Sequence, residues 1–212
     1  MTRKTPANYD RSVFINCPFD TAYESMLEAI VFATMFCRCV ARCALEIDDG
    51  SEVRIEKIVR IVEQCRLGIH DLSRTELDPE HALPRFNMPF ELGLFMGAKR
   101  FGTRSQKQKS ILILDTERFR YQKFLSDIAG QDIKAHDGTI KKAVGHVRNW
   151  LASNLEINDL PGQDAVMSAH ARFRSELPAM CQKKRMNPAQ LTFNDMTNFM
   201  HEWQKADARS FE

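Results

Sequence analysis

The stretch Arg85-Phe-Asn-Met-Pro-Phe-Glu-Leu-Gly-Leu-Phe-Met-Gly-Ala-Lys99 predicts a loop that turns into a helix. Asn87 can cap this helix, because its side-chain oxygen can accept a hydrogen bond from an amide two or three residues further on. Gly93 and Gly97 are four residues apart and share one face, so we expect the helix to lie close to another backbone there. Glu91 is then expected in the first turn, among apolar neighbours.

Apolar runs of strand length lie on both sides of this helix and recur along the chain. They cover residues 12–17, 39–45, 67–72, 110–115 and, more weakly, 132–136. Segments with helical spacing of apolar residues separate them, at about 23–36, 53–66, 117–129 and 139–155. Alternation of strand and helix predicts a parallel sheet covered on both faces. We therefore expect an α/β fold, a flavodoxin-like three-layer sandwich whose five-stranded, mostly parallel sheet has the order 2-1-3-4-5.

The two ends of the chain differ in composition from this α/β domain, which we place at residues 12–158. Residues 1–11 are polar, and we expect a loose N-terminus. Residues 159–212 are expected to form a C-terminal helical extension with helices at about 163–182 and 188–205. The second helix carries an apolar stripe of Leu191, Phe193, Met196, Phe199, Met200 and Trp203. Such a stripe packs against the body or against a second copy, so a homo-oligomer through residues 163–205 is one hypothesis.

The composition excludes several classes of function. Of 212 residues, 43% are hydrophobic and 27% charged, which is typical of a globular protein. The net charge of +2 gives no reason to expect nucleic acid as a partner, and we interpret the basic connector with Arg104, Lys107 and Lys109 as a solvated turn. No apolar run of about 18 residues or signal peptide is found, so we expect no membrane span and a cytoplasmic location.

Six cysteines raise the question of a metal site. Cys37, Cys39 and Cys43 are close in sequence, but no second pair of Cys or His lies nearby, as zinc sites usually require. We therefore predict buried, reduced thiols and no metal.

The predicted strand order points to one edge of the sheet as the ligand site. In the order 2-1-3-4-5 the chain reverses direction between strands one and three, and ligands bind at the carboxyl ends there. The loops Asn16–Thr21 and His70–Arg74 and the helix with Glu91 converge on that edge. Asn16 and Asp20 also fit turn and capping roles, and a structural histidine fits His70 equally well. The candidate substrate-binding residues are Asn16, Cys17, Asp20, His70, Asp71, Ser73, Arg85 and Asn87.

The chemistry available to such a site follows from its carboxylate. Cleavage of an N-glycosidic bond passes through an oxocarbenium-like sugar, which a carboxylate can stabilise or attack. Apolar neighbours raise the pKa of Glu91, whereas the positive end of a helix dipole lowers it. We expect an ionised Glu91 at the helix start, with His70 as a candidate proton carrier to the leaving base.

The segment Phe90-Glu91-Leu92-Gly93, after a strand ending in His70-Asp71-Leu72-Ser73, resembles the Phe-Glu-Leu-Gly signature of nucleoside 2-deoxyribosyltransferase-like proteins. These are relatives of the TIR-type NAD hydrolases, and in both groups a helix-borne Glu acts on the bond between sugar and base. The resemblance covers roughly residues 12–150. It implies that Glu91 is catalytic and that NAD or a nucleotide is a substrate, with no cofactor. It also implies sugar binding by Asn16, Asp20 or Asp71 and base stacking on Phe14, Phe19 or Phe86.

The chain departs from the transferase pattern next to the motif. Where the transferases carry an Asp six residues before the Glu, this chain has Arg85, which favours a phosphate-bearing substrate. Bulky Met88 and Pro89 replace a small residue. We therefore expect a divergent member of the group.

Three functions fit these observations. The first is an enzyme that hydrolyses the base–sugar bond of NAD or another nucleotide, similar to the TIR-like effectors of antiviral defence in bacteria. The second is a non-catalytic nucleotide-sensing module that signals through its C-terminal helices. The third is an interaction protein with a degenerate site.

Overall fold

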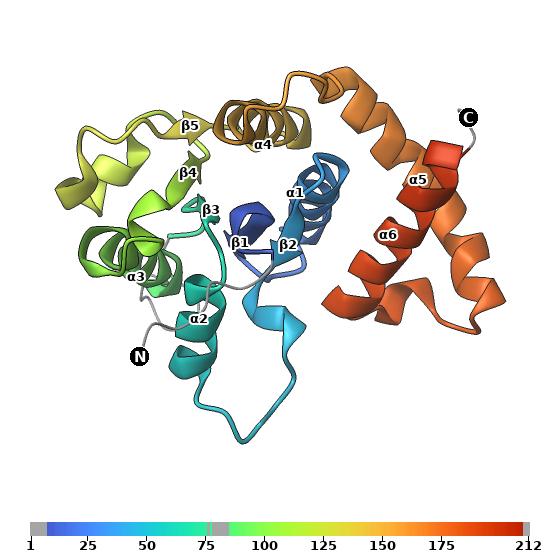
Figure 1. Cartoon of the computed structure of the whole chain (residues 1–212), viewed down its shortest axis with the longest axis horizontal. Coiled ribbons are helices and arrows are strands. Elements are labelled where there is room, and N and C mark those ends of the chain that lie inside the picture. Colours follow the sequence, from blue (N-terminus) through green and yellow to red (C-terminus); the bar gives the residue numbers. More distant parts are fainter. Residues whose placement is uncertain (1–7, 76, 78–84, 210–212) are drawn as a thin grey trace.

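The computed structural model of the chain describes residues 8–75, 77 and 85–209 (Figure 1). Its strands are β1 (Ser12–Asn16), β2 (Val40–Arg42), β3 (Leu67–Asp71), β4 (Ser110–Asp115) and β5 (Lys134–Ala135). Its α-helices are α1 (Glu24–Phe36), α2 (Arg54–Glu63), α3 (Asn87–Phe101), α4 (Ile140–Leu155), α5 (Gln163–Lys183) and α6 (Phe193–Arg209). Short 3₁₀ turns connect several of these elements.

The five strands form one sheet in the order β2-β1-β3-β4-β5, and every pairing is parallel. The predicted fold class and strand order are confirmed. Every residue of β1 and β3 is buried, because helices cover the sheet on both faces. Val13 and Ile15 share a hydrophobic cluster with α1 and α4, whereas Phe14 packs with α2 and α3 on the opposite face.

A close approach between α3 and the sheet does occur, but not at the predicted glycines. A Cβ atom added at Gly93 or Gly97 would meet no atom within 4 Å, so the expected backbone contact on that face is wrong. The tight position is Gly68 in β3, where a Cβ would lie 2.8 Å from the ring of Phe95. The glycine that this packing requires is therefore in the strand.

The helix predicted at 117–129 is wrong. Two 3₁₀ turns, Arg120–Lys123 and Ser126–Ile128, occupy this segment. Phe119 has a φ of 62°, in the left-handed region that an α-helix cannot continue through. The buried Asp115 carboxylate accepts from Arg120 Nε at 2.7 Å, which holds the segment in this irregular path.

The start of the described chain is anchored rather than loose. Tyr9 begins a 3₁₀ turn, Tyr9–Arg11, and its ring is buried. The Tyr9 hydroxyl donates to the carbonyl of Ser105 at 2.9 Å. The expected loose N-terminus is therefore wrong for residues 8–11, and residues 1–7 lie outside the described part.

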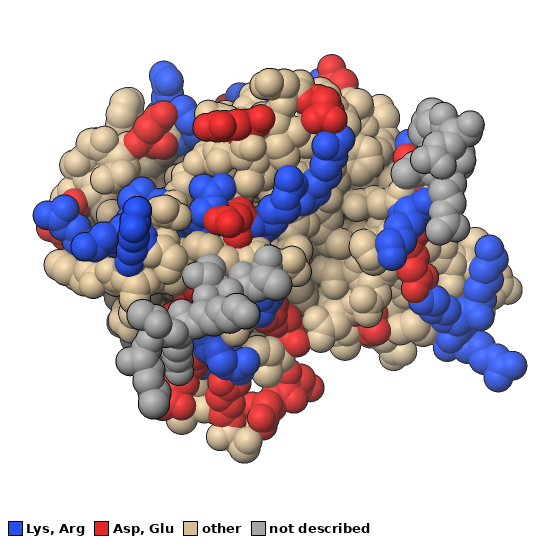
Figure 2. Space-filling view, in the orientation of Figure 1, with Lys and Arg blue, Asp and Glu red and all other residues tan. Residues whose placement is uncertain are grey.

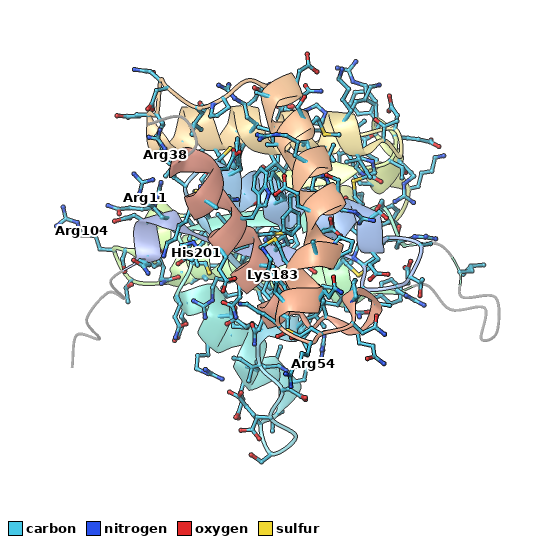
Figure 3. All side chains as sticks on the ribbon, turned by 90° about the vertical axis from the view of Figure 1, so that its right-hand side faces the viewer. Arg11, Arg38, Arg54, Arg104, Lys183 and His201 are labelled. Atoms are coloured by element: carbon cyan, nitrogen blue, oxygen red, sulfur yellow. The ribbon has the colours of Figure 1, made fainter. Side chains whose placement is uncertain are left out.

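The C-terminal helices pack against α1, as Figure 1 and the side view of Figure 3 show. The ring of Phe32 in α1 lies 5.5 Å from that of Phe173 and 5.8 Å from that of Trp203, centroid to centroid. Glu28 accepts from His170 Nε2 at 2.8 Å and from Arg174 Nη1 at 2.7 Å. The apolar stripe of α6 therefore packs against the body, and self-association through it stays a prediction.

Lys109 is buried, so its assignment to a solvated turn is wrong. Its ammonium group donates to the carbonyls of Val62, at 2.7 Å, and Cys65, and lies 4.2 Å from the centroid of the Phe95 ring. Val62 is in the last turn of α2 and Cys65 follows the C-cap residue Gln64, and the Val62 carbonyl also accepts from the amide of Cys65 at 3.2 Å. Burial lowers the pKa of Lys109 to about 8. The buried Lys109 thus provides hydrogen-bond donors for backbone carbonyls at the C-terminal end of α2.

Replacing Lys109 by Met should lower the free energy of unfolding by about 2–4 kcal/mol, because the carbonyls of Val62 and Cys65 each lose a buried, charged donor. Urea unfolding followed by circular dichroism measures this difference. The exposed Lys107 is the matched control, and Lys107→Met should change stability by less than about 0.5 kcal/mol. Equal stability of the two variants would contradict the proposed role.

Candidate functional site

A cleft of about 330 Å³ lies at the carboxyl end of β1, where the strand order reverses. Its walls come from the end of β1, the loop that follows, and the first residues of α2 and α3. The lining residues are Asn16, Cys17, Pro18, Phe19, Asp20, Arg54, Arg85, Asn87, Met88 and Glu91. The chain thus brings together six of the nine predicted site residues: Asn16, Cys17, Asp20, Arg85, Asn87 and Glu91.

Glu91 is a buried carboxylate on the wall of this cleft, with 4% of its surface exposed. It is the fifth residue of α3, so its predicted place in the first turn is wrong. Phe86, not Asn87, occupies the N-cap position, and no side chain caps the helix. Burial raises the pKa of Glu91 to about 7, partly offset by Arg54, whose Nη2 lies 3.8 Å from Glu91 Oε1. We expected an ionised Glu91, but with this pKa its carboxyl group is only partly ionised at neutral pH.

The orientation of the Asn16 amide is fixed by two acceptors. Its Nδ2 donates to the Met88 carbonyl at 2.9 Å and lies 3.0 Å from Nδ1 of His70. A carbonyl can only accept, so the amide nitrogen must face Met88, and its second hydrogen is left for His70. Both donors of Asn16 are thus used, which leaves Oδ1 as the hydrogen-bonding atom of the amide that could accept from a ligand.

His70 supports Asn16 and does not line the cleft. Its ring is fully buried, with centroids 5.8 Å from Phe14 and 5.2 Å from Phe95. Burial lowers the pKa of His70 to about 3, so the ring is neutral at physiological pH. The hypothesis of a proton carrier therefore loses its basis, and His70 acts as the hydrogen-bond acceptor that orients Asn16. Phe14 is likewise buried away from the cleft and cannot stack on a ligand.

Asp71 and Ser73 also lie outside the cleft. Asp71 accepts from the Tyr23 hydroxyl and from the backbone amide of Ser73, and His136 Nε2 lies 3.2 Å from its Oδ2. His136 Nδ1 accepts from the amide of Gly138, so Nε2 carries the proton that faces Asp71. Burial raises the pKa of Asp71, but His136, Ser73 and Tyr23 outweigh it and the pKa is lowered. This carboxylate therefore joins α1, β3 and the loop before α4, and its predicted role in sugar binding is wrong.

Charged side chains of both signs stand at the cleft. Asp20 accepts from the amide of Tyr23 at 3.1 Å and lies 3.4 Å from Arg74 Nη2 and 3.8 Å from Arg85 Nη1. Arg54 also lines the cleft and its side chain is half exposed. Arg54, the first residue of α2, was not among the predicted site residues, and the structure adds it to the cleft. Arg54 thus faces Glu91, and Arg74 and Arg85 face Asp20.

The cysteines fit the predicted chemistry of buried thiols. All six are free and buried. Burial raises the pKa of Cys17 well above its ordinary value, followed in size by the effect of Asp71, so this thiol remains protonated and does not act as a nucleophile. Within the described part of the chain, no group of three or more His, Cys, Asp or Glu side chains is arranged to hold a metal ion.

Comparison of the chain with protein-family models, with curated proteins and with solved structures found no match. No described helix is both long and apolar enough to span a membrane. On the face shown in Figure 2, basic and acidic side chains are interspersed, and acidic ones gather over the loop before α2.

Replacing Glu91 by Gln should stabilise the protein at high pH. Glu91 has a pKa of about 7 in the folded state and about 4.5 when unfolded, so its contribution to stability is present below pH 4.5 and lost as pH rises through 7. The neutral amide avoids this loss. We expect equal stability near pH 4 and a gain of about 2–3 kcal/mol for Glu91→Gln at pH 8.5, measured by urea unfolding. The exposed Glu117→Gln serves as control, and parallel profiles for all three proteins would contradict the burial argument.

Replacing Tyr23 by Phe should lower the free energy of unfolding by about 1–3 kcal/mol, because the buried Asp71 loses a donor. Tyr121 is a matched control, since it is also buried, and within the described residues its hydroxyl makes only a 3.5 Å contact with Gln122 Nε2. Tyr121→Phe should cost a fraction of that energy in the same unfolding measurement. A larger loss for Tyr121→Phe would show that the Asp71 network does not contribute as described.

Proposed function

We propose that this protein hydrolyses the bond between base and sugar in a nucleotide such as NAD, with Glu91 as the catalytic carboxylate. The observation that carries the proposal is the position of Glu91. It is a buried acid on the wall of the cleft at the switch point of the sheet, and the same cleft is lined by Asn16, whose amide hydrogens are both used within the fold. Buried acids with a shifted pKa in a cleft are typical of active sites.

The reaction follows from these groups. The C1′–N bond breaks, its electron pair leaves with the base, and positive charge develops on the sugar. The ionised carboxylate of Glu91 stabilises this charge or attacks C1′, and water then supplies the new hydroxyl on C1′. The remaining proton of that water goes to the base of an ordinary nucleotide, or to solvent when the substrate is NAD, whose nicotinamide leaves as a neutral molecule. Asn16 Oδ1 accepts from a sugar hydroxyl, and Arg54 and Arg85 bind phosphate oxygens.

The antiviral role implied by the resemblance, in which the enzyme depletes such a metabolite, is part of this proposal. The Phe90–Gly93 motif and the strand order support it. Removal of a metabolite needs only hydrolysis, with no second substrate to receive the sugar.

The test is to incubate the protein with NAD and, separately, with deoxynucleotides, and to measure free base by chromatography. Release should fall by at least about 100-fold in Glu91→Gln, while Glu117→Gln keeps the wild-type rate. Because the ionised form of Glu91 acts, the rate should rise about tenfold between pH 6 and pH 8.

Other outcomes separate the alternatives. Saturable binding of a nucleotide without release of base would contradict the enzyme hypothesis and favour the nucleotide-sensing module. A folded protein that neither binds nor cleaves any of these compounds would favour an interaction protein with a degenerate site. A rate that falls as pH rises through 7 would assign Glu91 to proton donation instead.

A further inference from the structure

A second cavity of about 240 Å³ lies next to the cleft, between the α/β body and the C-terminal extension. From the body, Leu27 and Val31 of α1 and Leu45 contribute to its walls. From the extension, Leu191 and Met196 close the opposite side. Seven of the twelve lining residues are apolar, and the other five include the carboxylates Asp20, Glu24 and Glu28.

The two cavities share a wall. Phe19 and Asp20, from the loop between β1 and α1, line both of them. Phe19 is 38% exposed although it is a large aromatic residue, and Leu45 on the second cavity is 43% exposed. A ligand that extends from the cleft into the second cavity therefore crosses the side chain of Phe19. Together the two cavities fall within the range of small-molecule sites, roughly 300–1,000 Å³.

The chemistry of the two compartments matches the two ends of one kind of molecule. The cleft offers Arg54 and Arg85 to an anion and Asn16 Oδ1 to a hydroxyl donor. The second cavity offers apolar surface and, on the wall that it shares with the cleft, the aromatic ring of Phe19, on which a flat ring can stack. Phosphate, polyol and flat aromatic ring in this order describe a nucleoside 5′-phosphate.

We propose that the second cavity is the base-binding compartment of the site, and that the ligand is a nucleoside 5′-phosphate, alone or within a dinucleotide. The inference rests on the proposed function, since it takes the sugar to lie at Glu91. It assigns to Phe19 the stacking role and to the start of α6 the far wall of the base compartment. The C-terminal extension is therefore part of the binding site, in addition to packing against α1.

The experiment compares two probes, adenosine 5′-monophosphate and ribose 5-phosphate, which differ only in the base. Their binding to the Glu91→Gln variant, in which the catalytic group is removed, is measured by isothermal titration calorimetry. We expect the adenosine compound to bind at least about tenfold more tightly. Adding Met196→Trp fills the second cavity and should remove that advantage, with ribose 5-phosphate binding unchanged.

Met180→Trp is the matched control, because Met180 is a partly buried methionine of α5 that does not line the cavity. Phe19→Ala is a second variant that opens the cavity instead of filling it, and it should also reduce binding of the adenosine compound selectively. Thermal melting confirms that each variant is folded before titration.

Three results would overturn the proposal. The first is equal affinity of the two probes for Glu91→Gln. The second is an unchanged preference in both Met196→Trp and Phe19→Ala. In either case base release by the wild-type protein would leave the proposed function standing. The third is a lack of binding by both probes together with a lack of base release, which would remove the proposed function as well.

Discussion

The contact between Asn16 and His70, which face each other in register across β1 and β3, sets the geometry of the cleft. His70 is neutral and held between aromatic rings, so its Nδ1 is a fixed acceptor. Asn16 gives one amide hydrogen to it and the other to the carbonyl of Met88. Because Met88 is the second residue of α3, one side chain of the sheet positions the start of this helix. Glu91 lies one turn further on, and its burial follows from that position.

The electrostatics of Glu91 show which of two opposing effects is larger. The helix dipole acts mainly within the first turn, and Glu91 lies just beyond it. Burial, which raises the pKa of Glu91, therefore has a larger effect than the groups that lower this pKa, and the half-exposed Arg54 offsets only part of the rise. A carboxylate in this place lowers stability at neutral pH, where Gln of the same shape would not. Residues that cost stability in a cleft are more often explained by function than by folding.

The sequence predicted what depends on periodicity and on chain order. Buried parallel strands are continuous apolar runs, so the bounds of 67–72 and 110–115 agree with the structure to within one residue. The switch-point rule then brought Asn16, Asp20 and Glu91 to one cleft, because it depends only on strand order. The rule does not say which side chains at the end of β3 are covered, and so it failed for His70, Asp71 and Ser73. Tertiary contacts also determine the burial of Lys109 and the path of the segment after β4, neither of which periodicity predicts. In that segment the left-handed backbone of Phe119 prevents a helix.

The C-terminal extension is linked to the cleft through α1. Rings of Phe173 and Trp203 pack on Phe32, and Glu28 joins the same helix to α5 through His170 and Arg174. The loop with Phe19 and Asp20 leads directly into α1, and Tyr23 at the end of that loop donates to Asp71 beneath the sheet edge. The loop is therefore held at one end by β1 and at the other by a helix that the extension covers. Closely packed interiors transmit small shifts rather than absorb them, so the packing of α5 and α6 on α1 contributes to the position of the wall that the two cavities share.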